Sequence, residues 1–129
     1  MRYLVKAKLK KKKEEALLKA IDEKTLGYGS IAYPTYTKCM ESARLLHTGE
    51  IQWLEVCYCR EAFGPGNELI EELPYWEEYF TDFKIKLARA PEKCEGYPVC
   101  GNCDCTKKLE KKLKNKGDHF LSNLRDKKK

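Results

Sequence analysis

Residues 51–59, with the sequence IQWLEVCYC, give the strongest strand signal in the chain and decide the fold. Side chains of a strand alternate between its two faces. Both faces are mainly apolar here, with Ile51, Trp53, Cys57 and Cys59 on one and Leu54, Val56 and Tyr58 on the other. Glu55 is the exception on the first face. A strand that is apolar on both faces belongs in the middle of a sheet that is covered on each side.

Further elements are predicted on both sides of this strand from hydrophobic periodicity. Two more strands are expected at residues 2–9 and 82–88, where apolar residues cluster or alternate with charged ones. Helices are expected at residues 12–24, 34–46, 74–80 and 106–115, with a last helical turn at 119–124.

The order of these elements predicts the α+β class, with a small sheet and helices mainly on one face. Within that class we expect a ferredoxin-like sandwich, with a cysteine-rich loop before the C-terminal helix. A fourth strand is expected at residues 30–33 or from a second subunit. A sheet of three strands would be incomplete, which leaves room for a homodimer.

Length and composition predict one domain. Residues 1–125 form it, including the cysteine-rich loop 94–105, and residues 126–129 form a basic disordered tail. The hydrophobic content of 42% is enough for a core. Because there is no apolar run of about 18 residues, no membrane partner is expected. Lys6 lies where a signal peptide would need apolar residues, so a cytoplasmic location is expected.

Six of the seven cysteines gather in two short segments and predict a thiolate site. They are Cys57, Cys59, Cys94, Cys100, Cys103 and Cys105. In a reducing compartment, clustered cysteines are more often metal ligands or redox groups than structural disulfides. The last four could hold zinc on their own, because zinc takes four ligands in a tetrahedron and the loop contains glycines and a proline that permit tight turns.

The ligand set and the metal are left open by the spacing. Cys57 and Cys59 would project from the same face of a strand and could complete a site with Cys100 and Cys103. An Fe–S cluster also takes four cysteines, but the spacing matches neither common ferredoxin pattern, so zinc is favoured.

Thiol redox chemistry is the alternative, through Cys100-Gly-Asn-Cys103. These residues resemble the Cys-Gly-x-Cys motif of thioredoxin-type oxidoreductases, a resemblance that covers four residues. The helix that follows, with Lys107 and Lys108 in its first turn, would lower the pKa of a nearby thiol. Disulfides remain an option as well. The sequence leaves enzymatic activity undecided.

Two other residues are given structural roles. Cys39 falls on the apolar stripe of the helix at 34–46 and is expected to be a small buried hydrophobic residue. His47 is expected to cap the C-terminal end of that helix.

Nucleic-acid binding is the second alternative, since the net charge of +6 is concentrated in lysine-rich segments. These segments are residues 6–13, 107–116 and 127–129. The favoured interpretation of the lysines is a solvated surface. Four aromatic residues at helical spacing could stack on bases, but core packing is favoured for Tyr75, Trp76, Tyr79 and Phe80.

Three motifs resemble an uncharacterised family of small archaeal proteins, found in methanogens in particular. They are Cys57-Tyr-Cys59, Pro74-Tyr-Trp-Glu-Glu-Tyr-Phe80 and Cys103-Asp-Cys105-Thr106. The resemblance would cover most of the chain and implies no activity. It implies an archaeal and thermophilic source. The charge carried mainly by Lys and Glu and the single glutamine, Gln52, agree with thermophile tendencies. In thermophiles intracellular disulfides are known.

Overall fold

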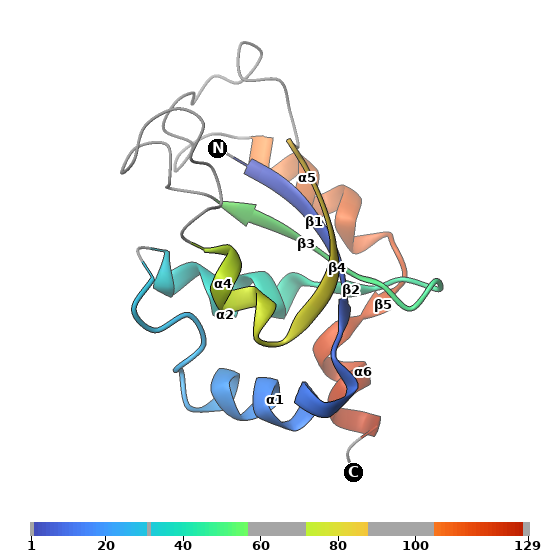
Figure 1. Ribbon diagram of the computed structural model, residues 1–129. Helices are drawn as coiled ribbons and strands as arrows, with labels where there is room; N and C mark the ends of the chain where they lie inside the picture. The colour runs from blue at the N-terminus through green and yellow to red at the C-terminus, as the bar shows by residue number, and fades with distance from the viewer. Residues whose placement is uncertain (1, 31, 57–71, 88–104, 128–129) are drawn as a thin grey trace.

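A computed structural model of the chain describes residues 2–30, 32–56, 72–87 and 105–127 (Figure 1). In chain order the elements are β1 (Arg2–Leu9), η1 (Lys11–Lys13), α1 (Glu14–Asp22), α2 (Tyr33–Ser42), β2 (Arg44–Leu45), β3 (Ile51–Val56), α4 (Leu73–Glu77), β4 (Phe80–Leu87), α5 (Cys105–Lys114), β5 (Asp118–His119) and α6 (Phe120–Lys127).

Within the described residues, the sheet has five strands in the order β4-β1-β3-β2-β5, and every neighbouring pair is antiparallel. Strand β3 is the middle one, as its two apolar faces predicted. Its residues Val56 to Ile51 pair with Arg2 to Ala7 of β1. The predicted α+β class is therefore confirmed.

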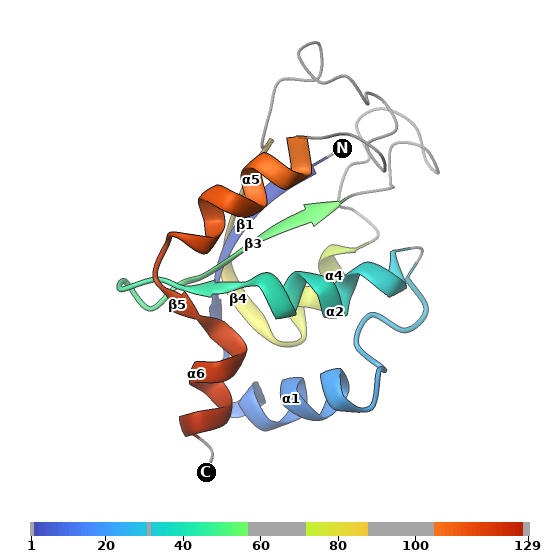
Figure 2. The same ribbon diagram turned by 180° about the vertical axis from the view of Figure 1, so that it is seen from behind.

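One face of the sheet carries the main core. Val5 of β1 and Trp53 of β3 are neighbours in the register and are both fully buried on this face. Four helices, α1, α2, α4 and α6, contribute buried side chains to the same cluster (Figure 1). Helix α5 lies on the other face, across β1 and β3 (Figure 2), where Leu54 and Leu113 are buried. The helices thus cover mainly one face, as expected.

Aromatic rings form the centre of this core. The Trp76 ring centroid lies 4.8 Å from that of Tyr36 and 4.8 Å from that of Trp53. The Phe80 centroid lies 4.9 Å from that of Trp53. The expectation that the aromatic group at residues 75–80 packs inside is confirmed, although Phe80 opens β4 rather than ending a helix.

The first four strands follow one another with helices after β1 and after β3, which is the element order of a ferredoxin-like sandwich. This chain adds α5, β5 and α6, with β5 pairing beside β2 at the edge of the sheet. The ferredoxin-like assignment stays a prediction.

Helix α2 is shorter than expected. It ends at Ser42, and Ala43 has extended backbone angles, with φ −63° and ψ 147°. The Ala43 carbonyl accepts the N–H of Phe120, and Arg44 and Leu45 pair with β3 and β5. Long-range pairing has overridden the helical pattern from residue 43 onward.

The capping role predicted for His47 is consequently wrong. His47 lies in the exposed turn between β2 and β3. His119 takes the role that was predicted for His47, because its Nε2 lies 2.8 Å from the carbonyl of Glu41 in the last turn of α2. The His119 Nδ1 accepts the backbone N–H of Ser122 at 3.2 Å, which leaves Nε2 to donate.

Two other expectations are corrected by the described residues. Ser30, Ala32 and Tyr33 do not form a strand, since Tyr33 opens α2, and the additional strands are β2 and β5 of the same chain. Residues 126 and 127, predicted to belong to a disordered tail, are the end of α6. That helix is held by an ion pair from Arg125 to Asp22 at 2.7 Å.

Candidate functional site

Cys39 is the one predicted thiol role that can be compared directly with the structure. It is buried on α2, and its Sγ donates to the carbonyl of Leu54 at 3.5 Å. Burial raises the pKa of the Cys39 thiol well above its usual value, and the nearby carboxyls of Glu55 and Glu72 raise it further. Cys39 is therefore an inert core residue, as predicted.

The predicted thiolate ligands lie almost entirely outside the described residues. Only Cys105 falls within them, as the first residue of α5, and Cys57, Cys59, Cys94, Cys100 and Cys103 do not. Residues 2–30, 32–56, 72–87 and 105–127 contain no group of three or more His, Cys, Asp or Glu side chains that could hold a metal. The thiolate site stays a prediction.

The described residues do place the points where the two cysteine segments attach. Strand β3 ends at Val56, paired with Arg2, and β4 ends at Leu87, paired with Tyr3. Both strands flank β1, so their ends are separated by two strand spacings, or about 10 Å. Cys105 begins α5 at this same end of the sheet (Figures 1 and 2). We call this end, marked by Val56, Leu87 and Cys105, the thiol end.

The far end of α5 is fixed to the sheet by the turn that follows it. Arg44 of β2 donates from Nε to the carbonyl of Lys116 at 2.7 Å and from Nη2 to that of Gly117 at 3.0 Å. Gly117 has a φ of +49°, and a Cβ there would lie 2.1 Å from the Leu45 carbonyl oxygen. This close approach requires glycine, and it holds the turn after α5 against β2.

A buried carboxyl lies one residue before the thiol end. Glu55 is buried on the core face of β3 and accepts the indole N–H of Trp76 at 2.6 Å. Burial raises the pKa of Glu55 from 4.5 to about 8, the Trp76 hydrogen bond opposes this rise, and the Glu72 carboxyl adds to it. Strand alternation had placed Glu55 on the apolar face, so the burial of its carboxyl could be predicted from the sequence.

Glu72 was not found from the sequence. It is fully buried just before α4, and its carbonyl accepts the hydroxyl of Tyr36 at 3.3 Å. The surrounding segment is rich in glutamate, a residue that is mostly exposed in folded proteins. The only local signal for burial is the aromatic group that follows, because Trp76 lies four residues later and is buried.

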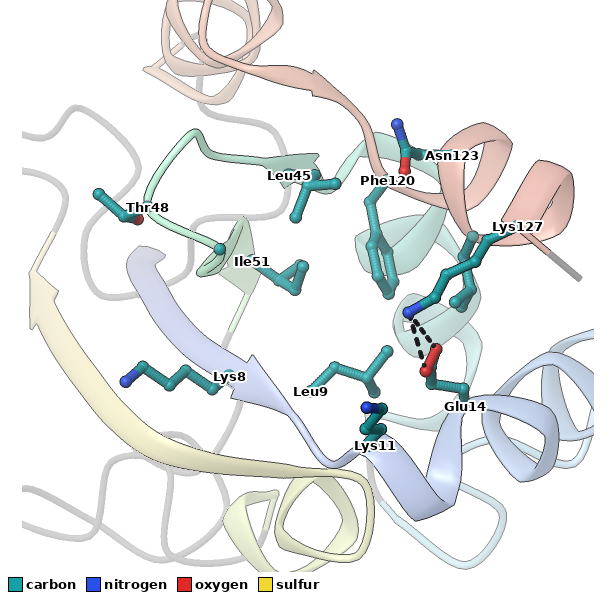
Figure 3. Close-up of a pocket in the computed structure, with 12 residues that line it drawn as sticks. Lys8, Leu9, Lys11, Glu14, Leu45, Thr48, Ile51, Phe120, Asn123 and Lys127 are labelled. Carbon is teal, nitrogen blue, oxygen red and sulfur yellow. Dashed lines mark hydrogen bonds and ion pairs between the residues drawn. The ribbon is translucent and has the colours of Figure 1, made fainter.

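A separate cavity of about 370 Å³ lies at the other end of β1. Its apolar wall comes from β1, β2, β3 and α6, whose side chains converge in Figure 3. Lys8, Lys11, Thr48 and Asn123 lie around it. One side is closed by Glu14, which is 5% exposed and forms an ion pair with Lys127 at 3.2 Å. We call this cavity the β1–α6 pocket; its apolar lining is Leu9, Leu45, Ile51, Phe120 and Leu124.

Lysines gather around a smaller hollow of about 240 Å³ beside β1, β3 and β4. Lys6 and Lys84 are paired in the register, and Lys84 is ion-paired with Glu50 at 3.1 Å. We call this hollow the lysine groove; its lysines are Lys6, Lys84, Lys86 and Lys116.

No protein-family model, curated protein or solved structure matches this chain. The proposals that follow therefore depend on its own residues. Among the helices within the described ranges, none has the length and apolar character needed to cross a membrane.

Proposed function

We propose that this protein binds a metal ion through cysteine thiolates at the thiol end of the sheet, with zinc favoured over an Fe–S cluster. The supporting observation is the placement of the attachment points. Val56, Leu87 and Cys105, which bound the two cysteine segments, lie at one end of a single sheet although they are far apart in sequence.

Covalent geometry allows the two segments to share one ion. Cys57 directly follows Val56 in the sequence, and consecutive Cα atoms in a chain are about 3.8 Å apart. Cys94 follows Leu87 by seven residues, a reach of up to about 25 Å. Cys105 opens α5, where the positive end of the helix dipole favours a thiolate. A cytoplasmic location is part of the proposal, because thiols stay reduced there.

Metal analysis of the full chain, purified with its thiols protected, tests this proposal. We expect about one zinc ion per chain, since a tetrahedral site uses four of the six thiolates. The double variant Cys100→Ser, Cys103→Ser should fall below about 0.1 ion per chain, because two of four ligands are lost. Cys39→Ala is the matched control and should keep the full metal content, since Cys39 is buried in the core.

The variant Cys57→Ser, Cys59→Ser identifies the ligand set. Full metal content would assign the ion to Cys94, Cys100, Cys103 and Cys105, and loss would show that the strand pair supplies ligands. Wild-type protein with less than about 0.5 zinc or iron per chain would contradict metal binding. A reversible Cys100–Cys103 disulfide in that metal-free protein would favour the redox alternative.

Nucleic-acid binding is a second candidate, favoured by the lysine groove. Lys84 is partly neutralised by Glu50, which leaves Lys6, Lys86 and Lys116 to meet phosphates. Three phosphate contacts on a single strand predict a slope of about −2 in a plot of log affinity against log salt.

Fluorescence anisotropy with a short labelled oligothymidine strand tests this candidate. We expect the affinity to fall by a factor of about 20 between 50 and 200 mM salt. Lys86→Glu should weaken binding by about tenfold. Lys19→Glu, an exposed lysine on α1 outside the groove, is the matched control. Equal effects of the two substitutions would show that the groove is not the binding surface.

A further inference from the structure

The β1–α6 pocket combines an apolar interior with positive charge at its mouth. Ile51 and Phe120 are buried in its wall, and Leu9 and Leu45 are half-buried there (Figure 3). Leu124 also lines the pocket and is buried. The volume of about 370 Å³ falls within the range of small-molecule sites. It corresponds to about a dozen water-sized volumes, enough for a ligand of about ten non-hydrogen atoms.

The charges of the lining favour an anion. Three lysines and one glutamate line the pocket, a formal charge of +2. Glu14 is already engaged, because Lys127 Nζ lies 3.3 Å from its Oε1 and 3.2 Å from its Oε2. The Lys8 Nζ lies 3.8 Å from Asp82 Oδ2, and both side chains are more than half exposed, so this pair is weak. The described residues give Lys11 no ion-pair partner.

A cationic ligand fits this lining poorly. Its charge would have to displace Lys127 from Glu14, the only acidic residue in the lining, and it would meet Lys8 and Lys11 on the way. A neutral apolar ligand would leave Lys11 unused. An anion with an apolar body satisfies both parts of the pocket.

We propose that the β1–α6 pocket binds a small amphipathic carboxylate, with its apolar body against Ile51 and Phe120 and its carboxylate at Lys11. The Glu14–Lys127 ion pair neutralises the acidic side of the wall. This site lies at the opposite end of β1 from the thiol end, and binding there does not depend on the proposed metal.

Titration of the full chain with octanoate, followed by methyl NMR and calorimetry, tests the proposal. We expect saturable binding to one site with a Kd below about 1 mM. The methyl signals of Leu45, Ile51 and Leu124 should shift most. Octylammonium, which has the same apolar tail and the opposite charge, should bind at least about ten times more weakly. Acetate, which has only the head group, should not saturate.

Variants distinguish binding in the pocket from a non-specific attraction of an anion to a basic protein. Lys11→Glu should weaken octanoate binding by at least about tenfold, and the adjacent Lys12→Glu by less than about twofold. Lys12 is exposed on the same short helix and does not line the pocket. Asn123→Trp, at an exposed position on the rim of the pocket, should block entry without touching the core. The Cys100→Ser, Cys103→Ser variant should bind octanoate as the wild type does.

Three results would overturn the proposal. The first is the absence of saturable methyl shifts at Leu45, Ile51 and Leu124. The second is equal binding of octanoate and octylammonium, which would indicate an apolar surface without charge selection. The third is equal loss of affinity in Lys11→Glu and Lys12→Glu, which would place the anion outside the pocket.

Discussion

Replacing Glu55 with glutamine is expected to make the protein more stable than the wild type at alkaline pH. The difference in free energy of unfolding between the variant and the wild type should be about 5 kcal/mol larger above pH 8 than near pH 4.5. The amide keeps an oxygen that can accept the Trp76 indole N–H, which the Glu55 carboxyl accepts at 2.6 Å. It removes a group that would have to ionise in the core. Burial is the main reason that the pKa of Glu55 is raised from 4.5 to about 8.

The sign of the effect follows from proton binding. Between pH 4.5 and about 8, the folded protein keeps the proton on Glu55 and the unfolded chain has released it. The free energy of unfolding of the wild type therefore falls as the pH rises through this interval, and the contribution levels off above it. At about 1.4 kcal/mol for each pH unit, the interval corresponds to about 5 kcal/mol.

Urea denaturation of both proteins near pH 4.5, 7 and 9 measures the difference. The two free energies of unfolding should lie close together at acidic pH and diverge with increasing pH. Glu77→Gln is the matched control on α4, where the side chain is exposed, and should change stability by less than about 0.5 kcal/mol. Parallel pH curves for the wild type and Glu55→Gln would show that the Glu55 carboxyl is not protonated in the folded core.

A buried carboxyl that lowers stability near neutral pH calls for a reason other than folding. Glu55 lies one residue from the end of β3, and Cys57 follows two residues later. Carboxyls with perturbed pKa values cluster at functional sites. Ionisation of Glu55 would add a negative charge next to the thiol end. A change in the protonation of Glu55 would therefore alter the charge beside Val56, the last residue of β3.

The strongly periodic elements could be predicted from the sequence because their signals are local. The apolar faces of β3 and the amphipathic stripe of α1 are present within single segments. The two-residue strands β2 and β5 could not be predicted, because they exist only through pairing. Arg44 and His119 are neighbours in the sheet although 75 positions separate them in the sequence. The end of α2 was missed for the same reason.

The two candidate sites also differ in whether a local sequence signal predicts them. Clustered cysteines are visible in the sequence, so the thiolate hypothesis needed no structure. The β1–α6 pocket could not be predicted from the sequence, because Leu9, Ile51 and Phe120 come from three separate segments. Helix α6, which supplies Phe120 and Leu124 to the pocket, follows a segment that is joined to α2 and β2 by the His119 contact with Glu41 and the Arg44 contact with Lys116. These contacts are non-local and have no signature in either segment alone.

Trp53→Ala is expected to lower the free energy of unfolding by about 3–5 kcal/mol. Trp53 is fully buried in the middle strand, and its ring lies 4.8 Å from Trp76 and 4.9 Å from Phe80 by centroid distance. Truncation removes the burial of a large aromatic side chain and leaves a cavity whose wall is made of two other rings. Urea denaturation at a single pH measures this loss.

The loss in Trp53→Ala should be a large part of the total free energy of unfolding, because domains of this size are stable by about 5–15 kcal/mol. Tyr28→Ala is the matched aromatic control, since the Tyr28 side chain is 76% exposed, and it should cost less than about 1 kcal/mol. A cost below about 1 kcal/mol for Trp53→Ala would contradict the central position of β3. That position is what holds Val56 beside β1, so the same result would remove the geometric support for the thiol end.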